Sequence, residues 1–175
     1  QGLPDSALVQ NGSFEDGHNI RDRSWGLVNE LEGWERTTDH RIEVQTGVVG
    51  QASEGRSLIE LDSTGNSGIG QTIETVPGGQ FMLSFDFSAR KNVAEASNGL
   101  EVWFDGKLID TMSADGKGLK DHQWTTKEYM VTAEGETAFL EFRGAGKSDS
   151  LGSMKPERTR LNSSHPSRSR MPSSA

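Results

Sequence analysis

The most constraining feature of this sequence is an alternation of apolar and polar residues over positions 81–89 (FMLSFDFSA). The apolar positions are Phe81, Leu83, Phe85 and Phe87. Successive side chains of a strand point to opposite faces, so this period of two predicts a β-strand with one buried face. The segment Leu100–Asp105 (LEVWFD) repeats the pattern and places Glu101 and Trp103 on the face opposite its apolar residues.

Other segments carry shorter patterns of the same kind. They are Arg41–Gln45, Ser57–Asp62, Ile69–Thr75, Lys107–Thr111, Trp124–Thr132 and Thr137–Arg143. Turn residues separate them, and Asp105-Gly106 is typical of a hairpin. Glycine is frequent at 21 residues and only 31% of the chain is hydrophobic, which suits many short strands and turns. The sequence therefore predicts an all-β, antiparallel sandwich.

Composition excludes several classes of protein. The formal net charge of −8 argues against nucleic acid, because phosphate binding needs a basic face. There is no cysteine, which excludes disulfides and thiolate metal sites. We expect no membrane insertion, since no apolar run approaches the roughly 18 residues that a spanning helix needs. An acidic surface also suits a hard cation such as calcium.

Both ends of the chain differ from the middle. Residues 1–7 are expected to be a linker from an upstream part of a larger protein. From Glu157 onward serine, arginine and proline dominate, so we expect no packed element there. The pieces TRLNSSH and SRMPSSA, within residues 159–175, resemble the translation of a sequencing adapter; the alternative is a natural disordered basic tail. Residues 153–175 are therefore predicted to be non-native or disordered.

The segment between these ends resembles a known family. The opening LVQNGSFE (Leu8–Glu15), later LSFDFSAR (Leu83–Arg90), SNGLEVWFDG (Ser97–Gly106) and LEFRGAGKSDSLG (Leu140–Gly152) look like galactose-binding-like jelly rolls. Such domains include carbohydrate-binding modules and domains of large secreted bacterial adhesins and type I-secreted repeat proteins. The resemblance implies a jelly-roll β-sandwich over residues 8–152. It also implies that the final strand is missing, since the family continues where residues 153–155 depart from the pattern.

The resemblance implies a structural calcium ion. In related modules the glutamate of the N-G-x-F-E opening binds it together with an acidic residue of the final strand. Carried over by position, this gives Glu15, with Asn11 contributing oxygens. Calcium takes about six to eight oxygen ligands, so the site would be incomplete in this chain. The alternative is that Glu15 only caps an exposed turn.

A sugar-binding face is the second candidate site. Asp86 and Arg90 lie on the polar face of the first strand, Glu101 and Trp103 on that of the next, and Asn98 precedes it. An aromatic plate with carboxylates, amides and arginine around it is the chemistry that binds sugars. The two strands bring these residues together if they are neighbours in one sheet. The alternative is an ordinary polar outer face with one tryptophan on it.

The remaining aromatic residues are interpreted as structural. Trp34, Trp124 and Tyr129 are expected in the core or in strands, whereas Trp25, in a polar loop, is the alternative aromatic contact. No histidine pair has the spacing of a metalloprotease, and no nucleophile elbow or phosphate loop occurs. We therefore expect no enzyme.

Two functional hypotheses follow from these observations. The first is a non-catalytic carbohydrate-binding or adhesion module of a larger extracellular bacterial protein, with extracellular or cell-surface glycans as partners. The second is a purely structural spacer domain of a long adhesin with no glycan ligand.

Overall fold

Strands make up the framework of the protein in the computed structural model, which describes residues 8–47, 51–52, 55–61, 67–88, 99–113, 115–121, 123–145 and 157–163. The strands are β1 (Trp25–Val28), β2 (Glu35–Arg36), β3 (Ile42–Gln45), β4 (Leu58–Glu60), β5 (Gly68–Glu74), β6 (Gln80–Phe87), β7 (Gly99–Phe104), β8 (Lys107–Ser113), β9 (Thr125–Thr132), β10 (Thr137–Gly144) and β11 (Glu157–Ser163). Every strand pair is antiparallel, as the sequence predicts.

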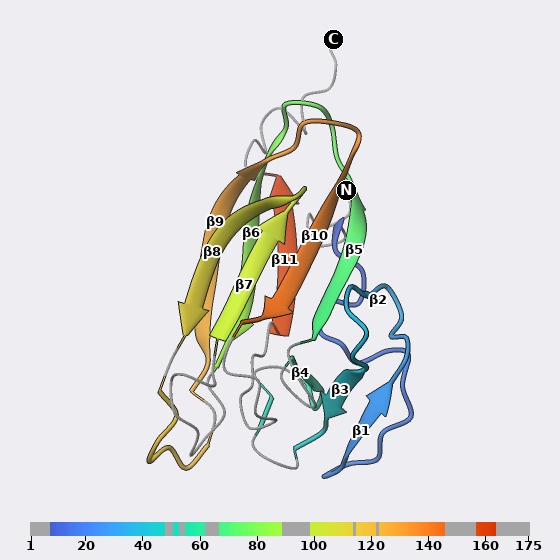
Figure 1. Ribbon diagram of the computed structural model, residues 1–175, viewed down its shortest axis with the longest axis vertical. Helices are drawn as coiled ribbons and strands as arrows, with labels where there is room; N and C mark the ends of the chain where they lie inside the picture. Colours follow the sequence, from blue (N-terminus) through green and yellow to red (C-terminus); the bar gives the residue numbers. More distant parts are fainter. Residues whose placement is uncertain are drawn as a thin grey trace.

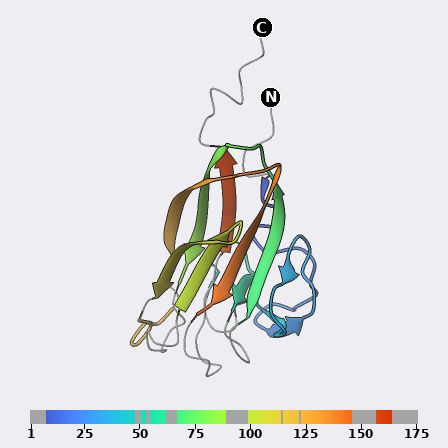
Figure 2. The same ribbon diagram turned by 45° about the horizontal axis from the view of Figure 1, so that its top comes forward.

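Two sheets form the layers of a sandwich (Figure 1). The front sheet has the order β2-β5-β10-β7-β8 and the rear sheet the order β11-β6-β9. Phe85 of β6 and Phe142 of β10 meet between them edge to face, with ring centroids 4.9 Å apart. A third sheet, β1-β3-β4, lies at one end, and Figure 2 shows this N-terminal part (blue) along one side of the sandwich.

The alternating segments form strands with the predicted faces. In β6 the phenylalanines and Leu83 are buried against the core, and in β7 Leu100, Val102 and Phe104 are buried while Glu101 and Trp103 point outward. The hairpin between β7 and β8 turns at Asp105 and Gly106, whose φ angles of 55° and 82° fit a type I′ turn. Period-two alternation therefore identifies the core side of β6 and β7 correctly.

The turn at Asn11–Phe14 packs the N-terminal part of the described chain against the core. Asn11 and Phe14 have φ angles of 51° and 63°, and the Phe14 amide donates to the Asn11 carbonyl at 3.1 Å. The turn buries the Phe14 ring 5.2 Å from the ring of Trp34, whose indole Nε1 donates to the same Asn11 carbonyl. The prediction that Trp34 belongs to the core is confirmed, since only 4% of it is exposed.

The C-terminal strand corrects one prediction. Glu157–Ser163 forms β11 beside β6, with Leu161 opposite Leu83 and fully buried. The expectation that nothing from Glu157 onward packs is therefore wrong for these residues, whereas the absence of the family's own final strand and the non-native origin of the tail stay predictions. Strand pairing uses backbone groups that any sequence offers to an open sheet edge, and one apolar side chain at the right register suffices to fill the core position. Residues 1–7, 153–156 and 164–175 lie outside the described residues.

Candidate functional site

A block of four polar and aromatic side chains lies on the outer face of the front sheet. Trp103 of β7 is directly opposite Glu141 of β10, and Glu101 of β7 is opposite Arg143. Directly opposed residues project on the same face of a sheet, with their Cβ atoms about 5 Å apart. We call Glu101, Trp103, Glu141 and Arg143 the outer-face cluster.

Hydrogen bonds and a cation–π contact hold the outer-face cluster together. The Arg143 guanidinium donates through Nε to Glu141 Oε2 at 2.7 Å and through Nη2 to Oε1 at 3.1 Å. Its Cζ lies 4.8 Å from the centroid of the Trp103 ring. The indole Nε1 of Trp103 donates to Glu101 Oε1 at 3.0 Å. The tryptophan ring is thus oriented both by its own nitrogen and by the cation over its face.

The electrostatics of this cluster favour a neutral ligand over an anionic one. Hydrogen bonding to Glu141, with smaller contributions from the charges of Glu141 and Glu101, raises the pKa of Arg143 above its ordinary value. One guanidinium therefore stands beside two carboxylates. The Glu141 side chain is only 9% exposed and that of Arg143 is 44% exposed, so the cation reaches solvent more than its partner does.

A second aromatic side chain extends this face. Phe139 precedes Glu141 by two positions on β10, and residues two apart on a strand share one face. Its ring lies against Gly70 of the neighbouring strand β5, where an added Cβ would come within 2.4 Å of the ring carbon Cζ. Only glycine at position 70 leaves room for the ring to lie this close to the sheet.

Asp86 does not join the outer-face cluster. It lies on β6 in the rear sheet, whereas Glu101 and Trp103 lie on β7 in the front sheet. Asp86 is 3% exposed and accepts a hydrogen bond from the Thr126 hydroxyl at 2.8 Å. The condition for these residues to meet, that the two strands are neighbours in one sheet, is therefore not met, because β6 and β7 belong to different layers. Arg90 and Asn98 lie outside the described residues.

Glu141, Arg143 and Phe139 were missed by the sequence reasoning. The signal was present in the alternation of residues 137–143, which predicts that these three share the face opposite Leu140 and Phe142. What the sequence does not contain is the pairing of β10 with β7, which brings them beside Trp103.

The residues predicted to bind calcium are engaged with protein groups. Glu15 Oε2 accepts from the amides of Arg56 and Ser57 at 2.8 Å each, and Oε1 accepts from the Ser57 hydroxyl at 3.1 Å. Asn11 Oδ1 accepts from the Asp16 amide, and its Nδ2 donates to two carbonyls. As arranged, these two side chains do not fit an ion without releasing those partners. In the described residues, no group of three or more histidine and acidic side chains has the geometry of a metal site. Calcium at Asn11 and Glu15 stays a prediction.

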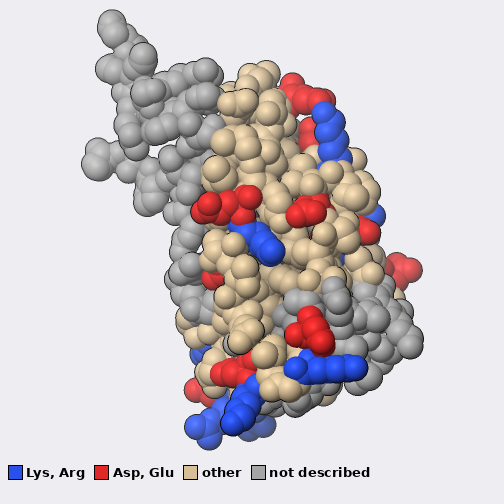
Figure 3. All heavy atoms as spheres, turned by 90° about the vertical axis from the view of Figure 1, so that its left-hand side faces the viewer, with Lys and Arg blue, Asp and Glu red and all other residues tan. Residues whose placement is uncertain are grey.

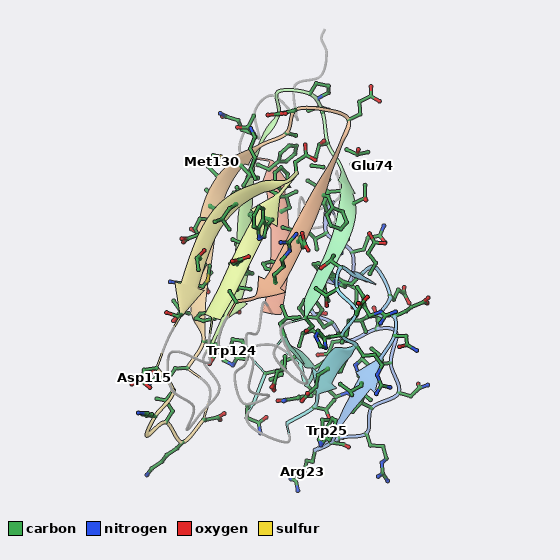
Figure 4. The ribbon with its side chains drawn as sticks, in the orientation of Figure 1. Arg23, Trp25, Glu74, Asp115, Trp124 and Met130 are labelled. Atoms are coloured by element: carbon green, nitrogen blue, oxygen red, sulfur yellow. The ribbon has the colours of Figure 1, made fainter. Side chains whose placement is uncertain are left out.

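Trp25 and Trp124 occupy different surroundings from Trp103. Trp124 Nε1 donates to the Gln51 carbonyl at 2.9 Å, which fits the structural role expected for it. Trp25 on β1 is 55% exposed, and Figure 4 places it at the end of the molecule that carries the small sheet. Trp25 is therefore an exposed aromatic side chain on a separate surface.

Charges of both signs lie on the side seen in Figure 3. Acidic and basic side chains are interspersed among uncharged described residues on that face, and several basic ones gather at its lower end beside acidic ones. Lys107 and Glu134 form such an exposed pair at 2.7 Å. The described part of the chain contains no helix that is both long and apolar enough to cross a membrane.

Known proteins resemble the chain in sequence over most of its length. It is 28% identical over 148 residues to a multifunctional-autoprocessing repeats-in-toxin protein of Vibrio cholerae serotype O1. It is 29% identical over 146 residues to the protein of the same name from Vibrio vulnificus. Each match covers 83% of this chain but only 3% and 2% of those proteins, respectively. No family model matches the chain.

Solved structures share the architecture at low sequence identity. A family 16 carbohydrate-binding module has a TM-score of 0.55 at 15% identity, with 88% of this chain and 98% of that chain covered. A family 35 module from Clostridium thermocellum has a TM-score of 0.54 at 13% identity, covering 81% and 99%. The fold is that of the carbohydrate-binding-module jelly rolls. An arabinose-bound α-L-arabinofuranosidase also matches, with a TM-score of 0.57 at 13% identity, 89% of this chain and 26% of the enzyme. The jelly-roll prediction is confirmed. At these low sequence identities, the likeness to solved structures shows the fold and nothing more.

Proposed function

We propose that this chain is a non-catalytic carbohydrate-binding module of a larger extracellular bacterial protein and that it binds glycan on the outer face of the front sheet. The observation that carries the proposal is the outer-face cluster, in which a tryptophan ring, an arginine fork and two carboxylates occupy neighbouring positions on β7 and β10. The fold shared with carbohydrate-binding modules and the sequence likeness to very long proteins support it.

The chemistry of the outer-face cluster suits sugar hydroxyls. Sugars present an apolar ring face to aromatic side chains and a rim of hydroxyls that both donate and accept. Arg143 has five N–H donors, of which Glu141 takes two, so the others are available to a ligand. Glu101 and Glu141 supply carboxylate acceptors at neighbouring positions of the same face. We expect neutral sugars to bind in preference to acidic ones, because two carboxylates surround the single cation.

Glycan-array binding with matched tryptophan variants tests the proposal. We expect the chain to bind a set of neutral glycans and Trp103→Ala to weaken the affinity at least about tenfold, since stacking contacts of aromatic residues dominate such sites. Trp25→Ala is the control, because Trp25 is also exposed but lies on β1. Equal losses for the two variants, or an array with no binding to the chain, would contradict the proposal.

One feature of the cluster favours the alternative, a structural spacer. The Trp103 ring already has the Arg143 guanidinium over one face and its nitrogen bonded to Glu101, which is also how a surface tryptophan is fixed in place without any ligand. In that case Trp103→Ala and Arg143→Met lower the urea midpoint of unfolding, and no glycan changes it. A glycan that raises the midpoint of the parent chain but not of Trp103→Ala distinguishes the module from the spacer.

A further inference from the structure

In the rear sheet, β11 covers the edge of β6 that β9 does not. Figure 1 shows β11 (red) beside β6 (green), and residues 160–163 pair with residues 81–84 in antiparallel register. Glu157 pairs with Asp86 further along β6, after an irregularity in the register. The backbone pairing therefore follows most of the length of β6, which would be an edge strand without β11.

One side chain anchors β11 in the core. Leu161 is directly opposite Leu83, and both are fully buried. Leu161 is the only apolar residue among the seven of β11 (ERTRLNS). A strand with one buried face normally offers an apolar residue at every second position. Because β11 offers only one, its place beside β6 depends on backbone pairing and on this single anchor.

The composition of β6 explains why its edge accepts a strand. Natural sheets protect open edges with charged residues, lysine above all, or with proline. The outer strands of the front and rear sheets carry such charges: Glu35 and Arg36 in β2, Lys107 and Asp110 in β8, Lys127 and Glu128 in β9, and Glu157, Arg158 and Arg160 in β11. Residues 80–85 of β6 (QFMLSF) include no charged residue and no proline. β6 thus lacks the residues that protect an open edge, and an extended segment can pair with it.

We propose that residues 81–86 of β6 form a strand-accepting site, which binds an extended peptide segment carrying one apolar side chain at the position of Leu161. Residues 157–163 of this chain are its occupant in the structure. In such strand addition, main-chain hydrogen bonds supply affinity and the pocket for a side chain supplies specificity. The site is on the rear sheet, whereas the outer-face cluster is on the front sheet, so this proposal does not depend on glycan binding.

The register of β6 makes the strand-accepting site selective. Successive side chains of a strand face opposite sides, and Phe81 and Leu83 are buried while Met82 between them is half-buried. Position 163 is opposite Phe81, and position 162 is opposite Met82. An apolar residue at 163 would therefore add to the core side of the segment, and one at 162 would not. A shift by one residue would exchange these two faces.

Peptide binding to variants of the whole chain tests the proposal. Leu161→Asp should release β11 from β6, because it places a charge at a fully buried position. We expect a fluorescein-labelled peptide with the sequence of residues 157–163 to bind this variant at least about tenfold more tightly than the parent, in which the attached segment occupies the site at a high effective concentration. Fluorescence polarisation measures both affinities. Met130→Asp is the control, because Met130 is exposed on β9 at the other edge of the same sheet, and it should bind the peptide no better than the parent does.

Leu161→Ala keeps the test decisive if Leu161→Asp does not fold. It removes most of the anchor without adding a charge, so it should also bind the peptide more tightly than the parent does. Saturating peptide should raise its urea midpoint of unfolding, because the peptide binds only the folded chain. Where either variant has lost cooperative unfolding, its return on adding peptide supports the proposal, and its continued absence contradicts it.

Leucine substitutions within the peptide test the register. Ser163→Leu should tighten binding to Leu161→Asp at least about tenfold, because it adds an apolar side chain opposite the buried Phe81. Asn162→Leu adds the same side chain opposite Met82 and should change the affinity less than about threefold. A peptide that itself carries Leu161→Asp should not bind.

Three results would overturn the proposal. The first is a peptide that binds neither Leu161→Asp nor Leu161→Ala. The second is an equal gain in affinity from Ser163→Leu and Asn162→Leu, which would show apolar adhesion without strand register. The third is peptide binding to Met130→Asp as tight as to Leu161→Asp, which would show that any disturbed edge of the rear sheet takes up the segment.

Discussion

Two polar clusters of this protein satisfy nearly buried carboxylates with different hydrogen-bond donors. In the outer-face cluster, Glu141 is satisfied by the guanidinium of Arg143, a cation from its own strand that also reaches solvent. In the small sheet, we call Glu43 and Gln45 of β3 and Glu60 of β4 the buried triad, in which the neutral amide of Gln45 donates to both carboxylates through Nε2. The first cluster carries its own positive charge and has a surface for a ligand. The second is nearly closed to solvent and leaves Gln45 Oε1 without a hydrogen-bond partner.

The largest expected effect comes from removing the bridging amide of the triad. Gln45→Leu leaves both buried carboxylates without the donors that Gln45 supplies, so we expect a loss of about 3–5 kcal/mol in the free energy of unfolding. Urea unfolding of the parent and the variant in EDTA measures it. A loss under about 1 kcal/mol would show that the triad is satisfied without this amide and would weaken the contrast between the clusters.

Removing the cation of the outer-face cluster should cost less. Arg143→Met keeps an apolar side chain of similar reach but removes the guanidinium over the Trp103 ring and deprives Glu141 of its two charged hydrogen bonds, for which we expect a loss of about 1–3 kcal/mol in the free energy of unfolding. The Arg143 side chain is 44% exposed, so water can enter the space that its guanidinium leaves and bond to Glu141. The same urea series measures this difference, and a loss as large as that of Gln45→Leu would break the comparison.

A third network, beside β4, should give the smallest effect, and it depends on pH. The Ile20 amide donates to His18 Nδ1, so the ring proton is on Nε2, which donates to the Ser57 hydroxyl at 3.0 Å. That hydroxyl in turn donates to Glu15. Burial, and then the charge of Arg56, lowers the pKa of His18 below its ordinary value of 6.5.

The sign of the pH effect follows from this shift. The unfolded chain takes up the histidine proton at a higher pH than the folded chain, so stability rises with pH across this interval. The contribution of His18 is present above about pH 6.5 and is lost as the pH falls through the lower pKa of the folded state. We expect the urea midpoint to fall between pH 7 and pH 5 and His18→Asn to flatten part of that slope. An unchanged slope in the variant would assign the effect to other groups.

The strands and their core-facing residues could be predicted from the sequence. Alternation in residues 81–87 and 100–104 identified the buried side chains of β6 and β7, and Asp105-Gly106 identified the hairpin. It did not show that β6 and β7 belong to different sheets, so Asp86 was grouped with Trp103 although the two lie on opposite layers. Nor did it identify β11, because the segment around Leu161 has no apolar period of its own.

The sequence by itself determined the strand positions other than β1, β2 and β11, and the apolar sides of β6 and β7, because alternation is a local property of neighbouring residues. Only the tertiary structure decided which strands pair and what lies on the second face. For β3 that second face is decisive: all four of its residues are buried, so Glu43 and Gln45, which a pattern of alternation would assign to solvent, lie inside the protein. Their chemistry depends on the pairing of β3 with β4, and the meeting of Trp103 with Arg143 depends on the pairing of β7 with β10. Burial of the shared core offsets the loop-closure cost of such pairings, and no local pattern in the sequence shows which of them form.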